Sequence, residues 1–369
     1  MSKIVEKPNI SLVTILHDNE EFFPLFQYHW DSLDYPKDKL EWIIVDDSKK
    51  DYSDLIPIDE NILYLKVDSS EYLEKIEFPK DDEKIVWNYF NKMKKLTDGF
   101  KRDYAVGMTS HEYVFHIDID TIYQPKAIQR KLRFLKENHL ECVYCKEMLC
   151  YDIYGKQLYK TENKIAGYES TLFYTKEFWK KSGFKWEDMH SEAVSFYYNK
   201  GSERKMDNYY DTIKLLSIEN MNKFRPVKIS LENLQVDIPD IIQKIHVNDH
   251  PLKKELNDLF YEKELNVLTI NSEIIEVFKE NKKWNIHELL YDKKQKEKVL
   301  LQKINELNKT FNICFINTKF PIWNIFDKVQ FDCIIIESEK NRDQMDSILK
   351  KKDYLLFNHL YIHKKYLLF

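Results

Sequence analysis

The chain has 369 residues, 57 of them Lys or Arg and 62 of them Asp or Glu, which gives a formal net charge of −5. This near balance leaves no domain-wide basic excess, so we expect no nucleic-acid partner. No apolar run reaches the roughly 18 residues that a membrane-spanning helix needs, and residues 1–7 lack the apolar core of a signal peptide. We therefore expect a cytoplasmic protein with no transmembrane segment. The length allows one large α/β domain and a smaller one.

Five cysteines, an odd number in a chain of this length, favour free buried thiols over a disulfide framework. Cys142, Cys145 and Cys150 are close enough in sequence to suggest a zinc cluster. Their spacing lacks a clear fourth ligand, however, and residues 141–145 are typical of a strand. We therefore favour buried thiols over zinc.

Apolar runs near the start predict the strands of a parallel sheet. Residues 10–16 and 41–45 are near-continuous apolar segments, and residues 62–67 are a third candidate strand. Between the first two strands, residues 20–33 carry aromatic side chains at helical spacing. Strand, helix and strand in this order predict a βαβ unit with a right-handed crossover.

Acidic and histidine side chains follow these predicted strands. His17 follows the first strand, and Asp46 and Asp47 follow the second. In sheets of this kind, ligands bind beyond the carboxyl ends of the strands. We therefore expect these residues to share one rim with Asp118 and Asp120, which follow a later strand.

The most informative motif is the segment 112–120, a β-branched and aromatic run that ends on Asp118 and Asp120. Side chains alternate along a strand, so both carboxylates should lie on one face. Oxygen ligands suit Mg²⁺ or Mn²⁺, and such ions usually bind one or two carboxylates together with substrate phosphates. The pair therefore predicts a divalent cation and a nucleotide diphosphate, although a single Asp-x-Asp can also arise by chance in a charged chain.

Residues 83–106 have a helical pattern that includes Arg102, just ahead of this strand. An arginine there could bind a diphosphate with two parallel hydrogen bonds, or it could be a solvated helix charge. Further along, we predict a basic helix at 125–136, a hairpin at 141–159 and a strand at 166–175.

Candidate catalytic carboxylates lie in the segment that follows. Glu187 and Asp188 are adjacent, and Ser191 can cap a helix that starts at Glu192 and ends before Gly201. A carboxylate in the first turn of a helix is favoured by the helix dipole, so capping electrostatics alone would also explain Glu192.

His246 follows an apolar run, as the aspartates do. A lone histidine is usually a packing or surface residue. A neutral imidazole at this place could instead complete a metal shell.

Beyond residue 260 the pattern predicts a second, smaller α/β unit. No glycine follows Gly201, so a Gly-rich turn for a dinucleotide or adenosylmethionine is excluded there. The expected strands are 265–270, 311–316, 331–336 and 354–357, and the expected helices are 272–280, 288–308 and 339–350.

Residues 9–250 resemble the GT-A fold nucleotide-sugar glycosyltransferases of family-2 type, including glycosyltransferases of large DNA viruses. The resemblance rests on four motifs in the expected order, at 13–19, 43–48, 101–103 and 116–120. It implies an α/β fold with a Rossmann-like mixed sheet flanked by helices. We therefore expect a catalytic domain at 1–258 and an accessory α/β region of unknown role at 259–369.

The resemblance also implies roles for single residues. Asp46 would contact the nucleotide base, and Asp118 with Asp120 would bind ribose and the metal. The acidic catalytic motif best matches Glu192, with Asp188 as the alternative base. The remaining implied residues are His17, Asp47 and Arg102 for the nucleotide-sugar and His246 for the metal.

The implied activity is transfer of a sugar from a nucleotide-sugar, with a UDP-sugar as the expected donor, to a hydroxyl of a glycan, protein or lipid. A divalent ion, Mn²⁺ or Mg²⁺, would stabilise the leaving diphosphate, and direct attack would invert the anomeric configuration. Two alternatives stay open. A nucleotidyltransferase would usually carry a Gly-rich phosphate loop after the first strand, which 16–19 lacks. An inactive glycan-binding or scaffold protein would not need the acidic residues.

Overall fold

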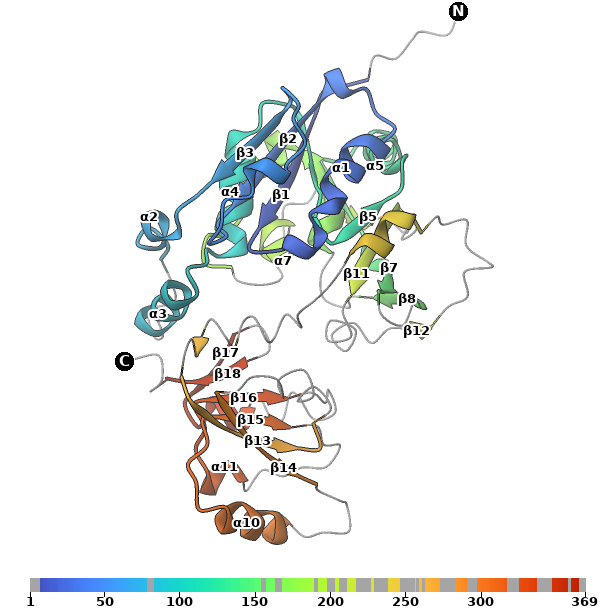
Figure 1. The fold of residues 1–369 in the computed structure, drawn as a ribbon. Helices are drawn as coiled ribbons and strands as arrows, with labels where there is room; N and C mark the ends of the chain where they lie inside the picture. Colours follow the sequence, from blue (N-terminus) through green and yellow to red (C-terminus); the bar gives the residue numbers. More distant parts are fainter. Residues whose placement is uncertain are drawn as a thin grey trace, which may run out of the picture. The chain divides into compact units, whose positions relative to one another are not determined.

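The computed structural model divides into two compact units, which are described separately (Figure 1). The first is Met1–Asp81 with Lys94–Asn248, and the second is Asp82–Met93 with Asp249–Phe369. The domain boundary predicted after residue 258 stays a prediction. The structure describes residues 7–77, 83–153, 157–162, 168–188, 192–197, 203–205, 211–216, 227–228, 238–245, 256, 259–260, 263–272, 283–290, 297–316, 325–336, 347–357 and 360–364.

A seven-stranded mixed sheet in the order β10-β6-β9-β4-β1-β2-β3 forms the centre of the first unit. Strands β4, β1, β2 and β3 run parallel, while β9 is antiparallel to both β4 and β6. The predicted strands at 10–16, 41–45 and 62–67 are confirmed as β1, β2 and β3. The strands are β1 (Ile10–Leu16), β2 (Leu40–Asp46), β3 (Ile62–Lys66), β4 (Tyr113–His116), β6 (Cys142–Tyr144), β9 (Phe173–Thr175) and β10 (Glu203–Lys205).

Helices flank this sheet because their apolar sides cover its buried strands. The predicted helix at 20–33 is a 3₁₀ turn, η1 (Glu20–Phe22), followed by α1 (Pro24–Ser32), and α5 (Ala127–Glu137) matches the predicted basic helix. Phe26 of α1 and Ile128 of α5 share one core with Trp42 of the sheet. The fold class predicted from the sequence, mixed α/β with a mixed sheet flanked by helices, is confirmed.

The single helix predicted at 83–106 is wrong, because the chain forms two helices there. Helix α3 (Glu83–Met93) belongs to the second unit and α4 (Asp98–Met108) to the first. Lys94 takes a left-handed backbone conformation with φ of 51°, which ends the first helix. Thr97 then caps α4, since its hydroxyl accepts a hydrogen bond from the amide of Phe100.

A second sheet of the first unit has five strands in the order β12-β8-β7-β11-β5. The hairpin predicted at 141–159 is confirmed in part, since β7 and β8 pair in antiparallel fashion while β6 joins the first sheet. Strand β11 lies between β7 and β5, and so lies beside the segment that carries the Asp-x-Asp motif. The strands are β5 (Thr121–Tyr123), β7 (Glu147–Asp152), β8 (Gln157–Glu162), β11 (Thr212–Leu216) and β12 (Val227–Lys228).

The second unit has a six-stranded sheet in the order β14-β13-β15-β16-β18-β17, with its own apolar core. All four predicted strands are present, but 288–308 is not one helix, because β14 ends at Leu289 and α10 begins at Glu297. Residues 273–280 of the predicted helix at 272–280 lie outside the described ranges. The elements are β13 (Leu265–Ile270), β14 (Trp284–Leu289), α10 (Glu297–Glu306), β15 (Ile313–Ile316), α11 (Ile325–Lys328), β16 (Cys333–Ile336), β17 (Tyr354–Phe357) and β18 (Leu360–His363).

The cysteines are buried in the two units. Cys142, Cys145 and Cys150 are buried and form no disulfide. Cys142 lies in β6 and Cys150 in β7, so these two thiols belong to different sheets.

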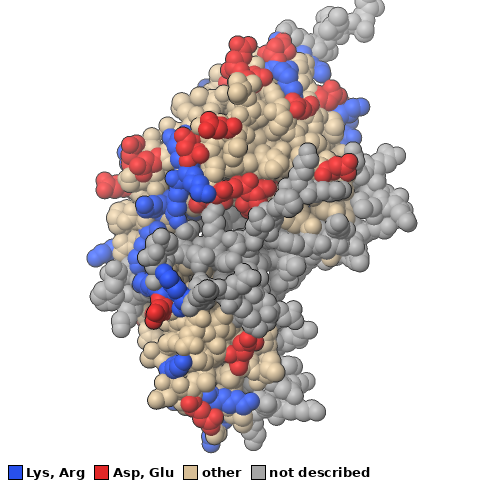
Figure 2. All heavy atoms as spheres, viewed as in Figure 1, with Lys and Arg blue, Asp and Glu red and all other residues tan. Residues whose placement is uncertain are grey.

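Charged side chains of both signs lie in small groups beside one another on the face shown in Figure 2. This mixture agrees with the near balance of basic and acidic residues in the sequence. Within the described ranges, each helix is too short or too polar to cross a bilayer.

Candidate active site

The Asp-x-Asp motif lies in a turn between β4 and β5. The strand predicted at 112–120 is shorter than expected, since β4 ends at His116. The amide of Asp118 donates to the phenol oxygen of Tyr123 at 2.8 Å instead of to a neighbouring strand, and the amide of Thr121 donates to the Asp118 carbonyl at 3.2 Å. Strand alternation therefore does not place Asp118 and Asp120; the turn does.

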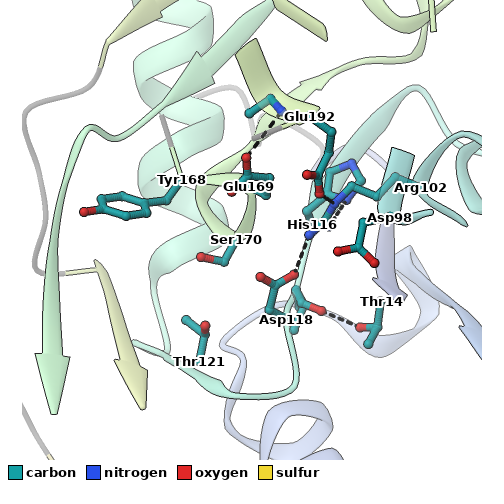
Figure 3. Close-up of polar contacts among 12 residues, drawn as sticks. Thr14, Asp98, Arg102, His116, Asp118, Thr121, Tyr168, Glu169, Ser170 and Glu192 are labelled. Atoms are coloured by element: carbon teal, nitrogen blue, oxygen red, sulfur yellow. Dashed lines mark hydrogen bonds and ion pairs between the residues drawn. The ribbon is translucent and has the colours of Figure 1, made fainter. Parts of the chain in front are cut away.

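The guanidinium of Arg102 joins three elements at this turn (Figure 3). Its Nε donates to Oε1 of Glu192 at 2.7 Å, and its NH2 donates to Oδ1 of Asp118 at 3.1 Å. Its NH1 lies 3.0 Å from Nδ1 of His116. Arg102 is 4% exposed, so these are charge-assisted bonds in a buried setting. Helices α4 and α7 (Glu192–Tyr197) and the end of β4 thus converge on one cation.

His116 is neutral and has a defined tautomer. A guanidinium can only donate, so Nδ1 of His116 accepts from Arg102 and Nε2 carries the proton. Nε2 then donates to the hydroxyl of Tyr174, 2.7 Å away. Burial, helped by the nearby Arg102 charge, holds the pKa of His116 well below its ordinary value. The imidazole therefore fixes the arginine without adding charge to the site.

Two glutamates lie close together at the start of α7. The backbone amide of Ala193 donates to Oε1 of Glu169 at 3.4 Å, and Glu169 belongs to the 3₁₀ helix η4 (Glu169–Thr171) (Figure 3). Burial and the neighbouring Glu169 charge raise the pKa of Glu192 to about 8, against the opposing effect of Arg102. Burial likewise raises the pKa of Glu169. The pair can therefore hold a proton near neutral pH, as a group that exchanges protons with a substrate should.

Asp188, the alternative base, has other contacts. Its side chain accepts a short hydrogen bond from the hydroxyl of Ser195 in α7, and its carbonyl accepts from the amide of Gly99 at 3.0 Å. A Cβ atom on Gly99 would lie 2.0 Å from the carbonyl oxygen of Lys185, so α4 and the 185–188 segment meet backbone to backbone. These contacts of Asp188 hold the 185–188 segment against α4, whereas the Glu192 carboxylate contacts the arginine.

Lys101, the neighbour of Arg102, gathers a different set of groups. Its ammonium lies 3.3 Å from Oδ1 of Asp47 and 3.2 Å from Oδ1 of Asp98. Nδ1 of His17 lies 3.0 Å from the same Asp47 oxygen, and the amide of Leu96 donates to the other oxygen of Asp47. Burial alone would raise the pKa of Asp47, but Lys101, His17 and these hydrogen bonds together lower it to about 2. Asp47 therefore stays ionised, and its partners hold it in one position.

Asp46, expected to contact the nucleotide base, is 0% exposed. Its Oδ1 accepts from the amide of Ser48 at 2.8 Å and also from the Ser48 hydroxyl. The hydroxyl of Tyr64 donates to its other oxygen, and the ammonium of Lys66 lies 3.7 Å away. Its contact with a base stays a prediction, and it would require these internal partners to rearrange.

The Asp118 and Asp120 carboxylates share a lysine that the sequence did not single out. Nζ of Lys214, from β11, lies 2.5 Å from Oδ1 of Asp120 and 3.5 Å from Oδ2 of Asp118. These are the oxygens that a bridging Mn²⁺ or Mg²⁺ would need, so the pair as arranged does not fit a bridging metal. Among the described residues, no three His, Cys, Asp or Glu side chains are grouped to hold an ion. The third predicted ligand, His246, lies outside the described ranges.

A cavity of about 530 Å³ lies at the carboxyl ends of β2 and β3, and Asp47 of the Lys101 cluster is part of its wall. Lysines and tyrosines in its wall are suited to phosphates and to an aromatic base, because ammonium groups attract phosphate oxygens and rings stack on bases. The cavity is lined by Asp47, Ser48, Lys49, Leu65, Lys66, Val67, Asp68, Ser69, Glu71, Tyr72, Lys94 and Tyr104.

The structure thus sorts the predicted residues into groups. Arg102, Asp118 and Glu192 form one cluster, with Lys214 and Asp120 at its edge. His17 and Asp47 join the lysine cluster of α4, and Asp46 and Asp188 have separate partners. Sequence reasoning missed Glu169 and Lys214, since neither lies in a motif.

No protein-family model matches the chain, and no curated protein matches its sequence. Three similar solved structures are S. aureus TarS with UDP-GlcNAc (13% identity, TM-score 0.38), S. aureus TarS with UDP (14%, 0.38) and the mannosyltransferase PcManGT from Pyrobaculum calidifontis with GDP-Man and Mn²⁺ (11%, 0.37). The matches cover 56%, 58% and 57% of this chain and 58%, 62% and 57% of those chains. The chain therefore spans less than two thirds of their length. At TM-scores this low, a function for this chain has to rest on its own residues.

Proposed function

We propose that the chain is a nucleotide-sugar glycosyltransferase of GT-A type that moves a sugar, first of all from a UDP-sugar, to an acceptor hydroxyl with inversion. The observation that carries the proposal is the convergence of Asp118, Arg102 and Glu192 on one buried network at the carboxyl ends of the parallel strands β1 and β4. A charged site for a diphosphate and a group that can accept a proton are what this reaction needs side by side. The resemblance to viral glycosyltransferases stays a prediction, as does the nature of the acceptor, whether glycan, protein or lipid.

The cavity beyond β2 and β3 is the proposed nucleotide site. Lys49, Lys66 and Lys94 line it together with Tyr72 and Tyr104. The rings of Tyr72 and Tyr104 meet edge to face with centroids 5.6 Å apart, so a planar base has an aromatic wall to pack on. The lysines favour an anionic ligand at this place over a neutral one.

Glu192 is the proposed base, and Asp188 is the second candidate. The acceptor hydroxyl would give its proton to Glu192 while its oxygen attacks the anomeric carbon from the face opposite the diphosphate. The bond from that carbon to the phosphate oxygen breaks in the same step, and the electron pair leaves with the nucleoside diphosphate. Attack from the opposite face inverts the anomeric configuration. Arg102 orients the Glu192 carboxylate through the 2.7 Å bond from its Nε.

The sequence predicts Mn²⁺ or Mg²⁺ at Asp118 and Asp120. A divalent ion at this place would have to displace the ammonium of Lys214 from Asp120. When bound, such an ion would act as a Lewis acid on the leaving diphosphate. The proposed function does not depend on that ion.

A thermal-shift titration with UDP tests the proposal, because a ligand at a hundredfold its dissociation constant adds about 2.7 kcal/mol to stability. We expect UDP to raise the melting temperature of the wild type and of the surface control Glu177→Gln. The increase for Asp118→Asn should be much smaller. Glu177 lies on the exposed side of α6 (Lys176–Lys180), with its side chain 71% exposed. Release of UDP from UDP-glucose and UDP-N-acetylglucosamine would then identify the donor. Absence of stabilisation by UDP, GDP and their sugars would contradict the proposal.

A further inference from the structure

We propose that Lys214 is the cation of the Asp118/Asp120 pair, so that the chain holds a donor diphosphate through a lysine ammonium and without a bridging divalent ion. The inference rests on the proposed function for the identity of the diphosphate. The contact between the lysine and the two aspartates does not depend on it.

The geometry places one ammonium between two carboxylates. Nζ of Lys214 lies 2.5 Å from Oδ1 of Asp120 and 3.5 Å from Oδ2 of Asp118. The three side chains are 18%, 23% and 17% exposed, in the order Lys214, Asp120 and Asp118. The group is therefore mostly buried but keeps some exposure to solvent, so a ligand oxygen can approach it.

The backbone fixes the lysine at this place. Lys214 pairs with Thr121 of β5 on one side and with Cys150 of β7 on the other. The amide of Leu215 donates to the carbonyl of Asp120 at 2.8 Å. Because β5 begins directly after Asp120, the strand register itself brings the lysine to the motif. A side chain carried by the middle strand of three is better positioned than one carried by a loop.

Charge also favours a resident lysine over an added metal. Arg102 binds Oδ1 of Asp118, and Lys214 binds the other Asp118 oxygen and Asp120, so two cations already face two carboxylates. Both cations would repel a divalent ion at these oxygens at short range.

An ammonium has three N–H donors and no fixed plane, so it can bind a phosphate oxygen while it keeps its carboxylate contacts. As the bond from the anomeric carbon to the phosphate breaks, negative charge grows on the diphosphate. A cation held in place before the reaction stabilises that charge without reorganisation. Lys214 thus provides the electrostatic part of what a metal would provide.

The test compares wild type with Lys214→Met, Lys214→Arg and the exposed control Lys180→Met, whose side chain is 55% exposed in the wild type. UDP affinity is measured by calorimetry in EDTA and in Mn²⁺, and Mn²⁺ affinity of the ligand-free proteins is measured by electron paramagnetic resonance. We expect wild type, the control and Lys214→Arg to bind UDP within about threefold in the two conditions. We expect Lys214→Met to lose at least about tenfold in EDTA and to recover in Mn²⁺, since its freed carboxylates can now take the ion.

A wild type that binds UDP only in Mn²⁺ would overturn the inference, whatever the variants do. If neither UDP nor GDP binds the wild type under any condition, the proposed function fails, and the Mn²⁺ measurement still decides on Lys214. Weak Mn²⁺ binding by the wild type with tighter binding by Lys214→Met would support a lysine that takes the place of the ion. Tight Mn²⁺ binding by the wild type would overturn it. If Lys214→Met does not fold, the wild type and Lys214→Arg decide by the same criteria.

Discussion

Two adjacent cations of α4 organise two clusters of opposite character. Lys101 binds Asp47 and Asp98, and the pKa of Asp47 is lowered to about 2. Arg102 binds Glu192 and Asp118, and the pKa of Glu192 is raised to about 8. Burial by itself would raise the pKa of both carboxylates. At Asp47 the charges of Lys101 and His17 and the hydrogen bonds outweigh burial, whereas at Glu192 the neighbouring Glu169 charge adds to burial and Arg102 does not offset the two.

Proton chemistry and rigid support thus come from consecutive residues of one helix. A carboxylate with a depressed pKa stays ionised and keeps its partners in place. A carboxylate with a pKa near neutrality can take and return a proton. The predictions that follow test this division, first in the arginine cluster and then in the lysine cluster.

Removing the proposed base should have the largest effect. We expect Glu192→Gln to slow the release of UDP from the bound donor by about 10²–10⁴-fold, since general bases contribute rate factors of that size. UDP affinity should change by only a few-fold. Asp188→Asn is the matched comparison, and it should retain most of the activity. If Asp188→Asn loses more activity than Glu192→Gln, the base is Asp188 and not Glu192.

The main effect of Asp47→Asn should be a loss of stability. The substitution leaves the buried ammonium of Lys101 with less opposing charge, and breaking a buried ion pair from one side costs about 3–5 kcal/mol. The free energy of unfolding in urea is the measurement. Glu177→Gln is the control, and a change there should be much smaller because Glu177 is exposed. If Asp47→Asn is as stable as the wild type, the cluster around Lys101 is not a rigid support.

The two clusters should respond to pH in opposite directions. The pKa of Glu192 is raised in the folded protein, so its contribution to stability is complete below pH 4.5 and is lost as pH rises through about 8. The pKa of Asp47 is lowered, so its contribution is complete above pH 3.8 and is lost as pH falls through about 2. Because a base works in its ionised form, activity should rise about tenfold per pH unit up to about pH 8 and then level off.

The profile for Glu192→Asp provides the comparison. It keeps a carboxylate at the site, so a shifted midpoint would assign the titration to this residue. An unchanged midpoint would assign it to another group.

A third residue of α4, Asp103, lies outside both clusters and should show a smaller effect. Its Oδ1 accepts from Nε1 of Trp179 at 2.7 Å and from the amide of Phe184 at 2.9 Å, and its Oδ2 accepts from Nε1 of Trp186 at 2.8 Å. We expect Asp103→Asn to cost about 1 kcal/mol of stability, since one amide oxygen can still accept. Urea unfolding should then show a lower stability, while the donor assay should show an activity close to that of the wild type. A loss of activity as large as that of Glu192→Gln would place Asp103 in the site.

The sequence predicted the elements whose signal is local. Residues 10–16 and 41–45 have nearly unbroken apolar runs, and both are buried strands. The sequence pattern predicted wrong element boundaries where the backbone conformation or a contact with another residue ends an element that the pattern continues. The left-handed Lys94 ends a helix that the periodicity continues, and the bond from the Asp118 amide to Tyr123 ends β4 before the aspartates.

The same limit applies to the candidate site. Arg102, Asp118 and Glu192 were found because each lies in or near a motif, and the structure brings these three together. Lys214 and Glu169 were missed because no local pattern marks them. They reach the site only through strand register and the packing of η4 on α7. Sequence periodicity carries no information about such partners.

The separation of Lys214 from Asp120 by 94 positions has a consequence for folding. Bringing β11 to β5 closes a long loop, whose entropy must be paid before the strands pair, and such contacts form slowly. Asp118 and Asp120 leave the ribosome well before their lysine partner does. Until β11 docks, the two carboxylates repel each other in a partly folded chain. The cationic partner of Asp120 is therefore added late in folding, and fragments that end before Thr212 should lack it.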